Sequence, residues 1–198
     1  MQRPLRQIRT DLRLLSRLEA SLHRAEIPES VRQATRSHAV VRLHDDWCRF
    51  IRAVVYSSAN GCTTVSGTRI EPSLPTRLRD RAMLDELRRR LHRRSSWHPT
   101  WSIPRVAIEC ANSLGASNAS ALAVVLGATM TAPGEMRLAR NFLVHREMNT
   151  ATALTTGLGV SSTSEVLDLV FGAPYRAGAT RFEYWLAELE LVAEALVQ

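Results

Sequence analysis

Six consecutive residues of this 198-residue chain combine a strong cation, an amide and an imidazole: Arg140-Asn141-Phe142-Leu143-Val144-His145. On a straight helix Asn141 and His145, four residues apart, share a face, and Arg140 lies beside that face on a long stem. The three apolar residues between them can hold the helix against a core. A guanidinium binds phosphate oxygens through paired hydrogen bonds, and histidine exchanges a proton most readily near neutral pH. The segment therefore predicts a site that grips or cuts a phosphodiester.

Cleavage of RNA without a metal needs a base for the 2′-hydroxyl, an acid for the departing 5′-oxygen and cations beside the phosphorus. His145 suits the base or the acid, Arg140 suits the non-bridging oxygens, and Asn141 can orient either group. The motif supplies one histidine per chain, so a two-fold dimer with facing motif helices would supply both proton-transfer groups. The expected product carries a 2′,3′-cyclic phosphate and leaves a 5′-hydroxyl. DNA, which lacks the 2′-hydroxyl, would be bound but not cut.

The pattern Arg140-Asn141-x-x-x-His145 resembles the signature of the HEPN superfamily (higher eukaryotes and prokaryotes nucleotide-binding) over these six residues. The resemblance implies a small α-helical bundle, usually a homodimer and frequently a metal-independent ribonuclease of toxin–antitoxin or antiphage systems. It implies catalytic roles for Arg140, Asn141 and His145, RNA as the substrate, and a cognate antitoxin or inhibitory protein as a partner.

Two other interpretations stay open at this point. The arginine and histidine could simply bridge the helix to its neighbours. The chain could also be a non-catalytic helical module that binds nucleic acid or a protein partner, as some members of such a family do.

A second cluster of polar residues lies within a long helical stretch earlier in the chain. His44 is followed by Asp45, and Arg49 and Arg52 lie on the next turns. This helix could abut the motif helix and line a shared cleft, although polar clusters of this kind are more often structural.

The arginines are distributed unevenly along the chain. All 26 basic residues are arginine; residues 1–105 carry 21 of them against 10 acidic residues, and residues 106–198 carry 5 against 9. An excess of guanidinium groups in the first part is what binding to a polyanion requires. Many of these arginines are also expected to face solvent or to pair with glutamate on helices.

Several functions are made improbable by what the sequence lacks. No Cys or His pair has zinc-ligand spacing matched by a second pair, and no glycine-rich phosphate loop is present, so we expect no metal and no cofactor. Cys48, Cys62 and Cys110 are scattered and odd in number, which is typical of reduced thiols in a cytoplasmic protein. No apolar run is long enough to span a membrane, and no secretory signal is evident. A cytoplasmic location without membrane contact is therefore expected.

The periodicity of apolar residues predicts an all-α fold. We expect a single helical domain over residues 1–198, a bundle of about six to eight helices with an N-terminal helical arm. Its parts are long helices in 1–60, shorter helices and loops in 61–132, and the motif helix with C-terminal helices in 133–198. The predicted helices cover 4–25, 28–59, 77–93, 104–114, 118–128, 163–171 and 181–197, with a short strand at 63–65. The motif helix is predicted to start at 133, and 150–158 is predicted to continue it or to form a broken extension of it.

Overall fold

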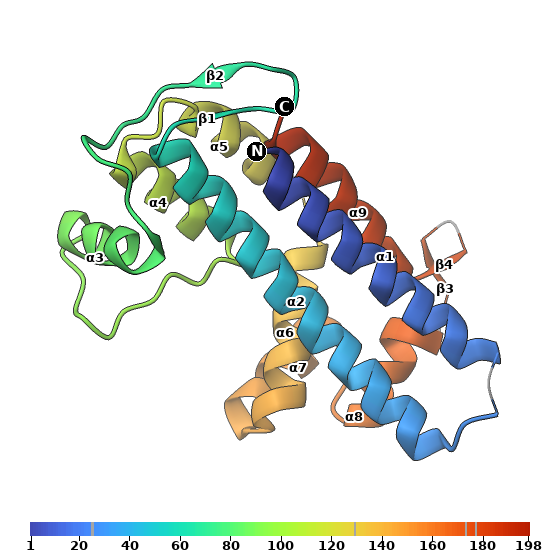
Figure 1. Ribbon diagram of the computed structural model, residues 1–198. Coiled ribbons are helices and arrows are strands. Elements are labelled where there is room, and N and C mark those ends of the chain that lie inside the picture. The colour runs from blue at the N-terminus through green and yellow to red at the C-terminus, as the bar shows by residue number, and fades with distance from the viewer. Residues whose placement is uncertain (25, 129, 173, 177) are drawn as a thin grey trace. The chain divides into compact units, whose positions relative to one another are not determined.

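The computed structural model of this protein describes residues 1–24, 26–128, 130–172, 174–176 and 178–198, with only the backbone at 23 and 24. Within these ranges the chain forms nine α-helices and four strands of two or three residues (Figure 1), which confirms the all-α class. The helices are α1 Gln2–Arg24, α2 Glu29–Ala59, α3 Asp80–Arg90, α4 Pro104–Leu114, α5 Ala119–Gly127, α6 Ala132–His145, α7 Met148–Leu158, α8 Thr163–Leu167 and α9 Arg181–Leu196. A π-helical turn, η1 Asp168–Gly172, follows α8, and the strands are β1 Cys62–Thr63, β2 Arg69–Ile70, β3 Pro174–Arg176 and β4 Ala179–Thr180.

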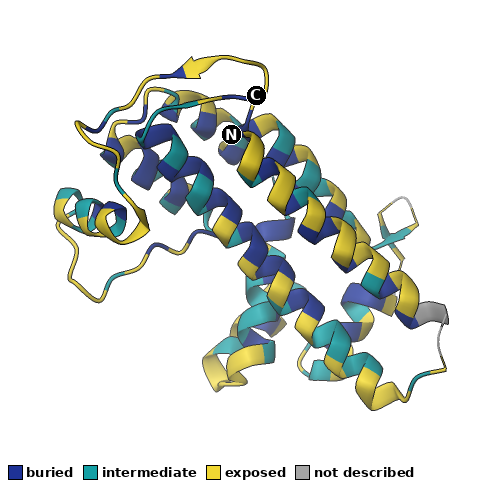
Figure 2. Ribbon diagram, viewed as in Figure 1, coloured by how far each residue is buried: buried dark blue, intermediate teal, exposed yellow. Residues whose placement is uncertain are grey.

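Most of these helices begin and end where the sequence predicts. The amphipathic pattern of residues 4–25 forms α1, whose apolar stripe is buried at Leu5, Ile8, Leu12, Leu15 and Leu22 (Figure 2). Both predicted capping boxes are present: the hydroxyl of Ser162 accepts from the Glu165 amide, and that of Thr180 accepts from the Glu183 amide. Local side-chain chemistry therefore determines where α8 and α9 start.

Helix α3 is shorter than predicted, because it begins at Asp80 rather than at Arg77. The side-chain amide of Asn60 donates to the Leu78 carbonyl at 2.9 Å and accepts from the Leu78 amide at 2.9 Å. These two hydrogen bonds hold the backbone at Leu78 against the end of α2, and Arg79 is extended, with φ −86° and ψ 167°. A contact 18 residues distant in the sequence thus overrides the local tendency to form helix.

The strand predicted at 63–65 begins one residue earlier and ends two residues earlier, as β1 at 62–63. β1 pairs antiparallel with β2, with Cys62 opposite Ile70, whereas the amide of Val65 donates instead to the carbonyl of Val197 at 2.8 Å. The strand is therefore shorter, and its continuation is attached to the C-terminal residues.

The chain divides into two compact units. The first contains Met1–Ile8, Cys48–Thr129 and Leu191–Gln198; the second contains Arg9–Trp47 and Met130–Glu190. The prediction of one domain over the whole chain stays a prediction. The first unit buries side chains that include Val54, Met83, Leu87, Leu114 and Leu122, and the second buries side chains that include Leu43, Met136, Phe171, Phe182 and Trp185.

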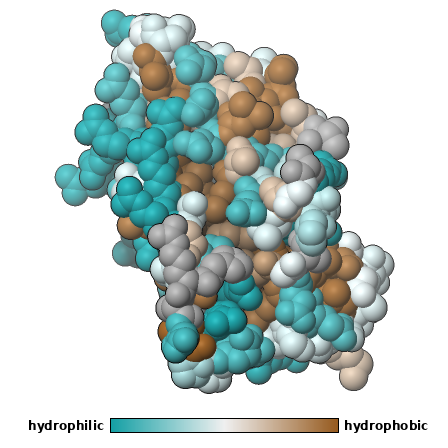
Figure 3. Space-filling model, turned by 90° about the vertical axis from the view of Figure 1, so that its right-hand side faces the viewer, coloured by the Kyte–Doolittle hydropathy of each residue, from teal (hydrophilic) through white to brown (hydrophobic). Residues whose placement is uncertain are grey.

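The exposed surface is mixed in character. Figure 3 shows one face, on which apolar patches lie between hydrophilic side chains. Large apolar side chains that are exposed in the described residues are Leu14, Val31, Val65, Val124, Val144, Met148 and Leu191. No helix in the described ranges is long and apolar enough to cross a membrane.

Candidate active site

The start of the motif helix α6 is held by two glutamates, one from α9 and one of its own. Glu188 of α9 accepts hydrogen bonds from the backbone amides of Thr131 and Ala132, the latter at 2.6 Å. A carboxylate in this position satisfies amides that the helix itself leaves without partners and complements the positive end of the helix dipole. Glu135 in the first turn accepts from Arg181 at 2.6 Å and from the indole of Trp185 at 2.9 Å. The beginning of α6 is therefore anchored to α9 by polar contacts.

The apolar face of α6 orients the rest of the helix. Met136, Ala139 and Phe142 recur every three residues and are buried, with 0%, 0% and 7% of their surface exposed. On another side α7 approaches closely, because Gly157 has no side chain and a Cβ there would collide with a methyl group of Leu138. Arg140 and Asn141 are only partly covered by this packing, and His145 at the end of α6 is exposed.

The guanidinium of Arg140 joins the three motif residues. Its Nη1 lies 3.2 Å from Nε2 of His145 and 3.4 Å from Oδ1 of Asn141. A guanidinium has donors and no acceptor, so in the first contact Nε2 of His145 must accept. The imidazole in this arrangement has no proton on Nε2, and its lone pair points to the place where the guanidinium now lies. The structure thus brings together Arg140, Asn141 and His145.

The site is open at the end where the histidine lies. His145 and the four residues after it are exposed, whereas Arg140 and Asn141 are half-buried; Figure 2 shows this gradation along α6 and α7. The helix ends directly after the histidine because Arg146 has a left-handed backbone, with φ 50° and ψ 28°. The predicted helix at 150–158 is thus a separate helix, α7, which begins at Met148. The imidazole lies at a chain reversal and is exposed to solvent.

Two residues of α2 complete the cluster. Oδ1 of Asp45 lies 3.9 Å from Nε of Arg140 and 3.1 Å from Nδ1 of His44. The Asp45 side chain is 51% exposed, and that of His44 is only 11% exposed. The structure therefore brings His44 and Asp45 to the motif helix.

His44 is poorly suited to carry a proton. Burial lowers its pKa from the ordinary value of 6.5, and the positive charges of Arg140 and Arg137 lower it further, against the opposite effect of Asp45. His44 is therefore mainly neutral at neutral pH and positions its neighbours.

Arg137 is a member of this cluster that the sequence interpretation omitted. It lies three residues before Arg140, hence on the same side of α6, and its charge acts on His44. The spacing would have identified it.

Arg49 and Arg52, predicted to line the same cleft, belong to the other compact unit. There Nη2 of Arg52 lies 3.7 Å from Oδ2 of Asp80. The role of Arg49 and Arg52 as cleft-lining residues stays a prediction.

The polar atoms of the cluster are incompletely paired. Nε of Arg140 is buried and has no hydrogen-bond partner among the described residues, because Asp45 is too distant for a hydrogen bond. An unpaired buried donor of this kind carries an unmet desolvation cost. The described residues include no group of three or more His, Cys, Asp or Glu side chains arranged to bind a metal ion.

The cluster consists of an imidazole, a guanidinium in contact with its Nε2, and a carboxylate near the other end of the guanidinium. Comparison of the chain with protein-family models, with curated proteins and with solved structures finds no match.

Proposed function

We propose that this protein is a metal-independent endoribonuclease of the HEPN type. The observation that carries the proposal is the 3.2 Å contact of the Arg140 guanidinium with Nε2 of an exposed His145. This contact joins a phosphate-binding cation to a proton acceptor within one polar cluster. Because the His145 side chain is exposed, a polynucleotide would have room to bind beside it.

In the proposed reaction Nε2 of His145 removes the proton of a 2′-hydroxyl, and the resulting oxygen attacks the adjacent phosphorus. The bond between O2′ and phosphorus forms while the bond to the 5′-oxygen breaks, and that oxygen takes a proton from an acid. Arg140 transfers its hydrogen bonds from the imidazole to the non-bridging oxygens, where negative charge accumulates. Asn141 stays one turn before the histidine and orients it. The products are a 2′,3′-cyclic phosphate and a 5′-hydroxyl.

The acid is best supplied by a second copy of the chain. His44, the other histidine of the cluster, is buried and has a lowered pKa, so it is a weak candidate for protonating the leaving group. Val144 and Met148, on either side of His145 in the sequence, are 46% and 85% exposed. Exposed apolar side chains beside a polar site are typical of an interface. We therefore propose a homodimer in which the two His145 side chains share one cleft.

The biological setting in this proposal is that of a toxin or antiphage effector restrained by an antitoxin or another inhibitory protein. It rests on the family resemblance of the motif. A ribonuclease without sequence-specific restraint would damage its own cell, so the proposal requires such a partner.

The direct test compares His145→Ala with a matched histidine variant on RNA substrates. His38 is exposed on α2, so His38→Ala removes an imidazole without touching the cluster. We expect wild type and His38→Ala to cleave RNA to fragments with 2′,3′-cyclic phosphate ends. His145→Ala should lose about 10²- to 10⁴-fold in rate, the usual contribution of a proton-transfer group, while remaining folded.

Two further substrates and one variant sharpen the test. An oligonucleotide with a single 2′-deoxyribose at the cut position should resist cleavage there, because the nucleophile is missing. Arg140→Ala should also lose activity, whereas a metal chelator should have no effect. Cleavage of DNA, or wild-type cleavage by His145→Ala, would exclude the mechanism.

A non-catalytic helical module that binds nucleic acid or a partner is the second candidate, favoured by the arginine excess of residues 1–105. On this alternative His145→Ala changes little. Reversal of several charges in the first part of the chain should then weaken RNA binding and reduce its dependence on salt. Measurement of binding and cleavage on the same variants separates the two functions.

A further inference from the structure

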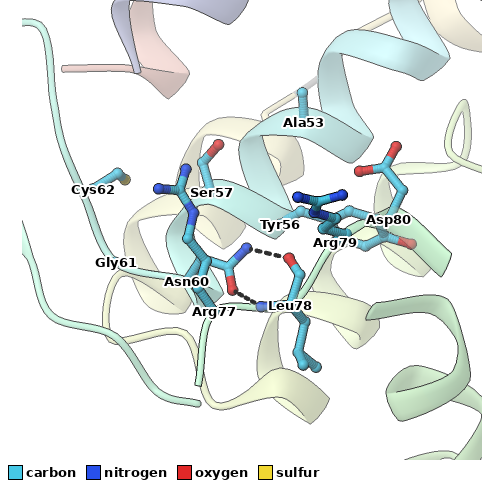
Figure 4. A pocket seen from close by; sticks show the side chains of 10 residues that line it. All are labelled: Ala53, Tyr56, Ser57, Asn60, Gly61, Cys62, Arg77, Leu78, Arg79 and Asp80. Carbon is cyan, nitrogen blue, oxygen red and sulfur yellow. Dashed lines mark hydrogen bonds between the residues drawn. The ribbon is translucent and has the colours of Figure 1, made fainter. Parts of the chain in front are cut away.

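A cavity of about 760 Å³ lies in the first unit, and none of its lining residues belongs to the proposed nuclease site. Its walls are the last turns of α2, the residues that follow α2 and the segment 77–80 that leads into α3 (Figure 4). The volume lies within the range of small-molecule sites, roughly 300–1,000 Å³. The cavity is thus larger than an inorganic anion requires.

The wall formed by the segment before α3 is organised by Asn60. The two hydrogen bonds from its side-chain amide to Leu78, drawn as dashed lines in Figure 4, hold this residue in place. Because alternate side chains of an extended chain point the same way, Arg77 and Arg79 both line the cavity. Figure 4 shows the Arg77 guanidinium toward Ser57 and that of Arg79 toward Tyr56 and Asp80. The segment held by this side-chain amide therefore contributes two guanidinium groups to the lining of one cavity.

The lining residues leave positive charge and donors available. Neither Arg77 nor Arg79 forms a side-chain hydrogen bond or an ion pair within the described part of the chain, and the same holds for the hydroxyl of Ser57. The one lining carboxylate, Asp80, has Arg52 at 3.7 Å. The local charge is therefore positive after Asp80 is counted.

The N-terminus of α3 adds to this electrostatic preference. Arg79 is the N-cap residue, and its side chain forms no capping hydrogen bond. Because Arg79 and Asp80 line the cavity, the positive end of this 11-residue helix lies beside it, a position in which anions are stabilised.

We propose that this cavity binds a small phosphorylated metabolite. The phosphate group contacts the guanidinium groups of Arg77 and Arg79, the Ser57 hydroxyl and the first amides of α3, and the remaining volume accommodates the organic part. Guanidinium pairs match phosphate oxygens in geometry as well as in charge. The site is independent of the proposed nuclease reaction, because its residues belong to the other unit.

Calorimetric titration of the full chain with AMP, inorganic phosphate and adenosine tests this proposal. We expect AMP and phosphate to bind and adenosine not to bind, since the phosphate supplies the recognition. The double variant Arg77→Ala/Arg79→Ala should weaken AMP binding at least 10-fold. The matched control is Arg94→Ala/Arg105→Ala, which removes the same charge at exposed positions outside the lining and away from the start of α3, and should bind as wild type does.

A second measurement locates the ligand without a variant. Amide chemical shifts recorded during phosphate titration should change at residues 57–60 and 77–81 and stay constant elsewhere. Equal affinity for adenosine and AMP, equal losses in the two double variants, or binding of an RNA oligonucleotide in the absence of AMP and phosphate binding would each overturn the proposal. Because His145→Ala should bind AMP unchanged, failure of the nuclease proposal and failure of this one are distinguishable.

Discussion

Arg140 and Asp45 approach each other from two helices, with Nε of the guanidinium 3.9 Å from Oδ1 of the carboxylate. Half of the Asp45 side chain is exposed, so an ion pair of this kind contributes only about 0–1 kcal/mol to stability. Its consequence is geometric: Asp45 lies behind the guanidinium, whose other end extends to Nε2 of His145. Asp45 is therefore best described as a positioning residue for Arg140.

Two variants should shift the pKa of His44 in opposite directions if Asp45 and Arg140 both lie beside it. Asp45→Asn removes a negative charge that raises the His44 pKa, so the pKa should fall further below 6.5. Arg140→Ala removes a positive charge that lowers it, so the pKa should rise. Titration of the imidazole proton resonances by NMR measures both changes. Shifts of the same sign in both variants would contradict the proposed geometry.

The stability of the protein should depend on His44 at mildly acidic pH. Its pKa is lowered in the folded state, so below the unfolded value of 6.5 the unfolded chain binds more protons. Stability from this residue is complete above pH 6.5 and is lost as the pH falls below it. Denaturant unfolding of wild type and His44→Gln between pH 7.5 and 5 should show a smaller loss in the variant. His38→Gln, an exposed site on the same helix, should retain the wild-type slope.

The contact of Glu188 with the start of α6 should contribute measurably to folding. Glu188→Ala leaves the Thr131 and Ala132 amides without their acceptor, and loss of a helix cap costs about 1–2 kcal/mol. Chemical denaturation measures this cost. The exposed Glu147, whose side chain caps nothing, provides the control; Glu147→Ala should change stability by less than about 0.5 kcal/mol. Equal effects would exclude the capping role.

Alanine substitutions at two glycines should distinguish the stability cost of backbone strain from that of steric crowding. Gly61 and Gly67 both have left-handed backbones, with φ 76° and 95°. A Cβ at Gly61 would lie 2.9 Å from the backbone nitrogen of Pro72, whereas a Cβ at Gly67 would have no described atom within 4 Å. Gly67→Ala should cost about 1 kcal/mol through backbone strain alone. Gly61→Ala should cost at least about 1 kcal/mol more, because the backbone of Pro72 must shift as well. Thermal unfolding of the two variants gives the difference directly.

Local pattern was sufficient to predict the helices but insufficient for the features that depend on distant contacts. Periodic leucines and capping boxes gave α1, α8 and α9, and the spacing in the motif predicted that Asn141 and His145 share a side of α6. The late start of α3 and the pairing of Val65 with Val197 arise from hydrogen bonds to residues far along the chain. No local signal contains that information.

The same reason explains what was missed at the two sites. The cavity depends on Asn60 holding Leu78, a contact between two segments whose sequences predict only a helix end and a helix start. The cluster depends on α2 bringing Asp45 to Arg140, for which the sequence offered residue types without a distance. The end of α6 could not be predicted either. Arg146 adopts a left-handed backbone that usually favours glycine, so the sequence does not indicate a chain reversal after His145.

Each compact unit is assembled from separate stretches of the chain, three in one case and two in the other. No single truncation of the chain isolates either unit, because each is interrupted along the sequence by a stretch of the other. Circular permutation or internal linkers would be needed to isolate either half, and each introduces new connections of its own. Genetic dissection of the two proposed activities must therefore proceed by single substitutions within an intact polypeptide.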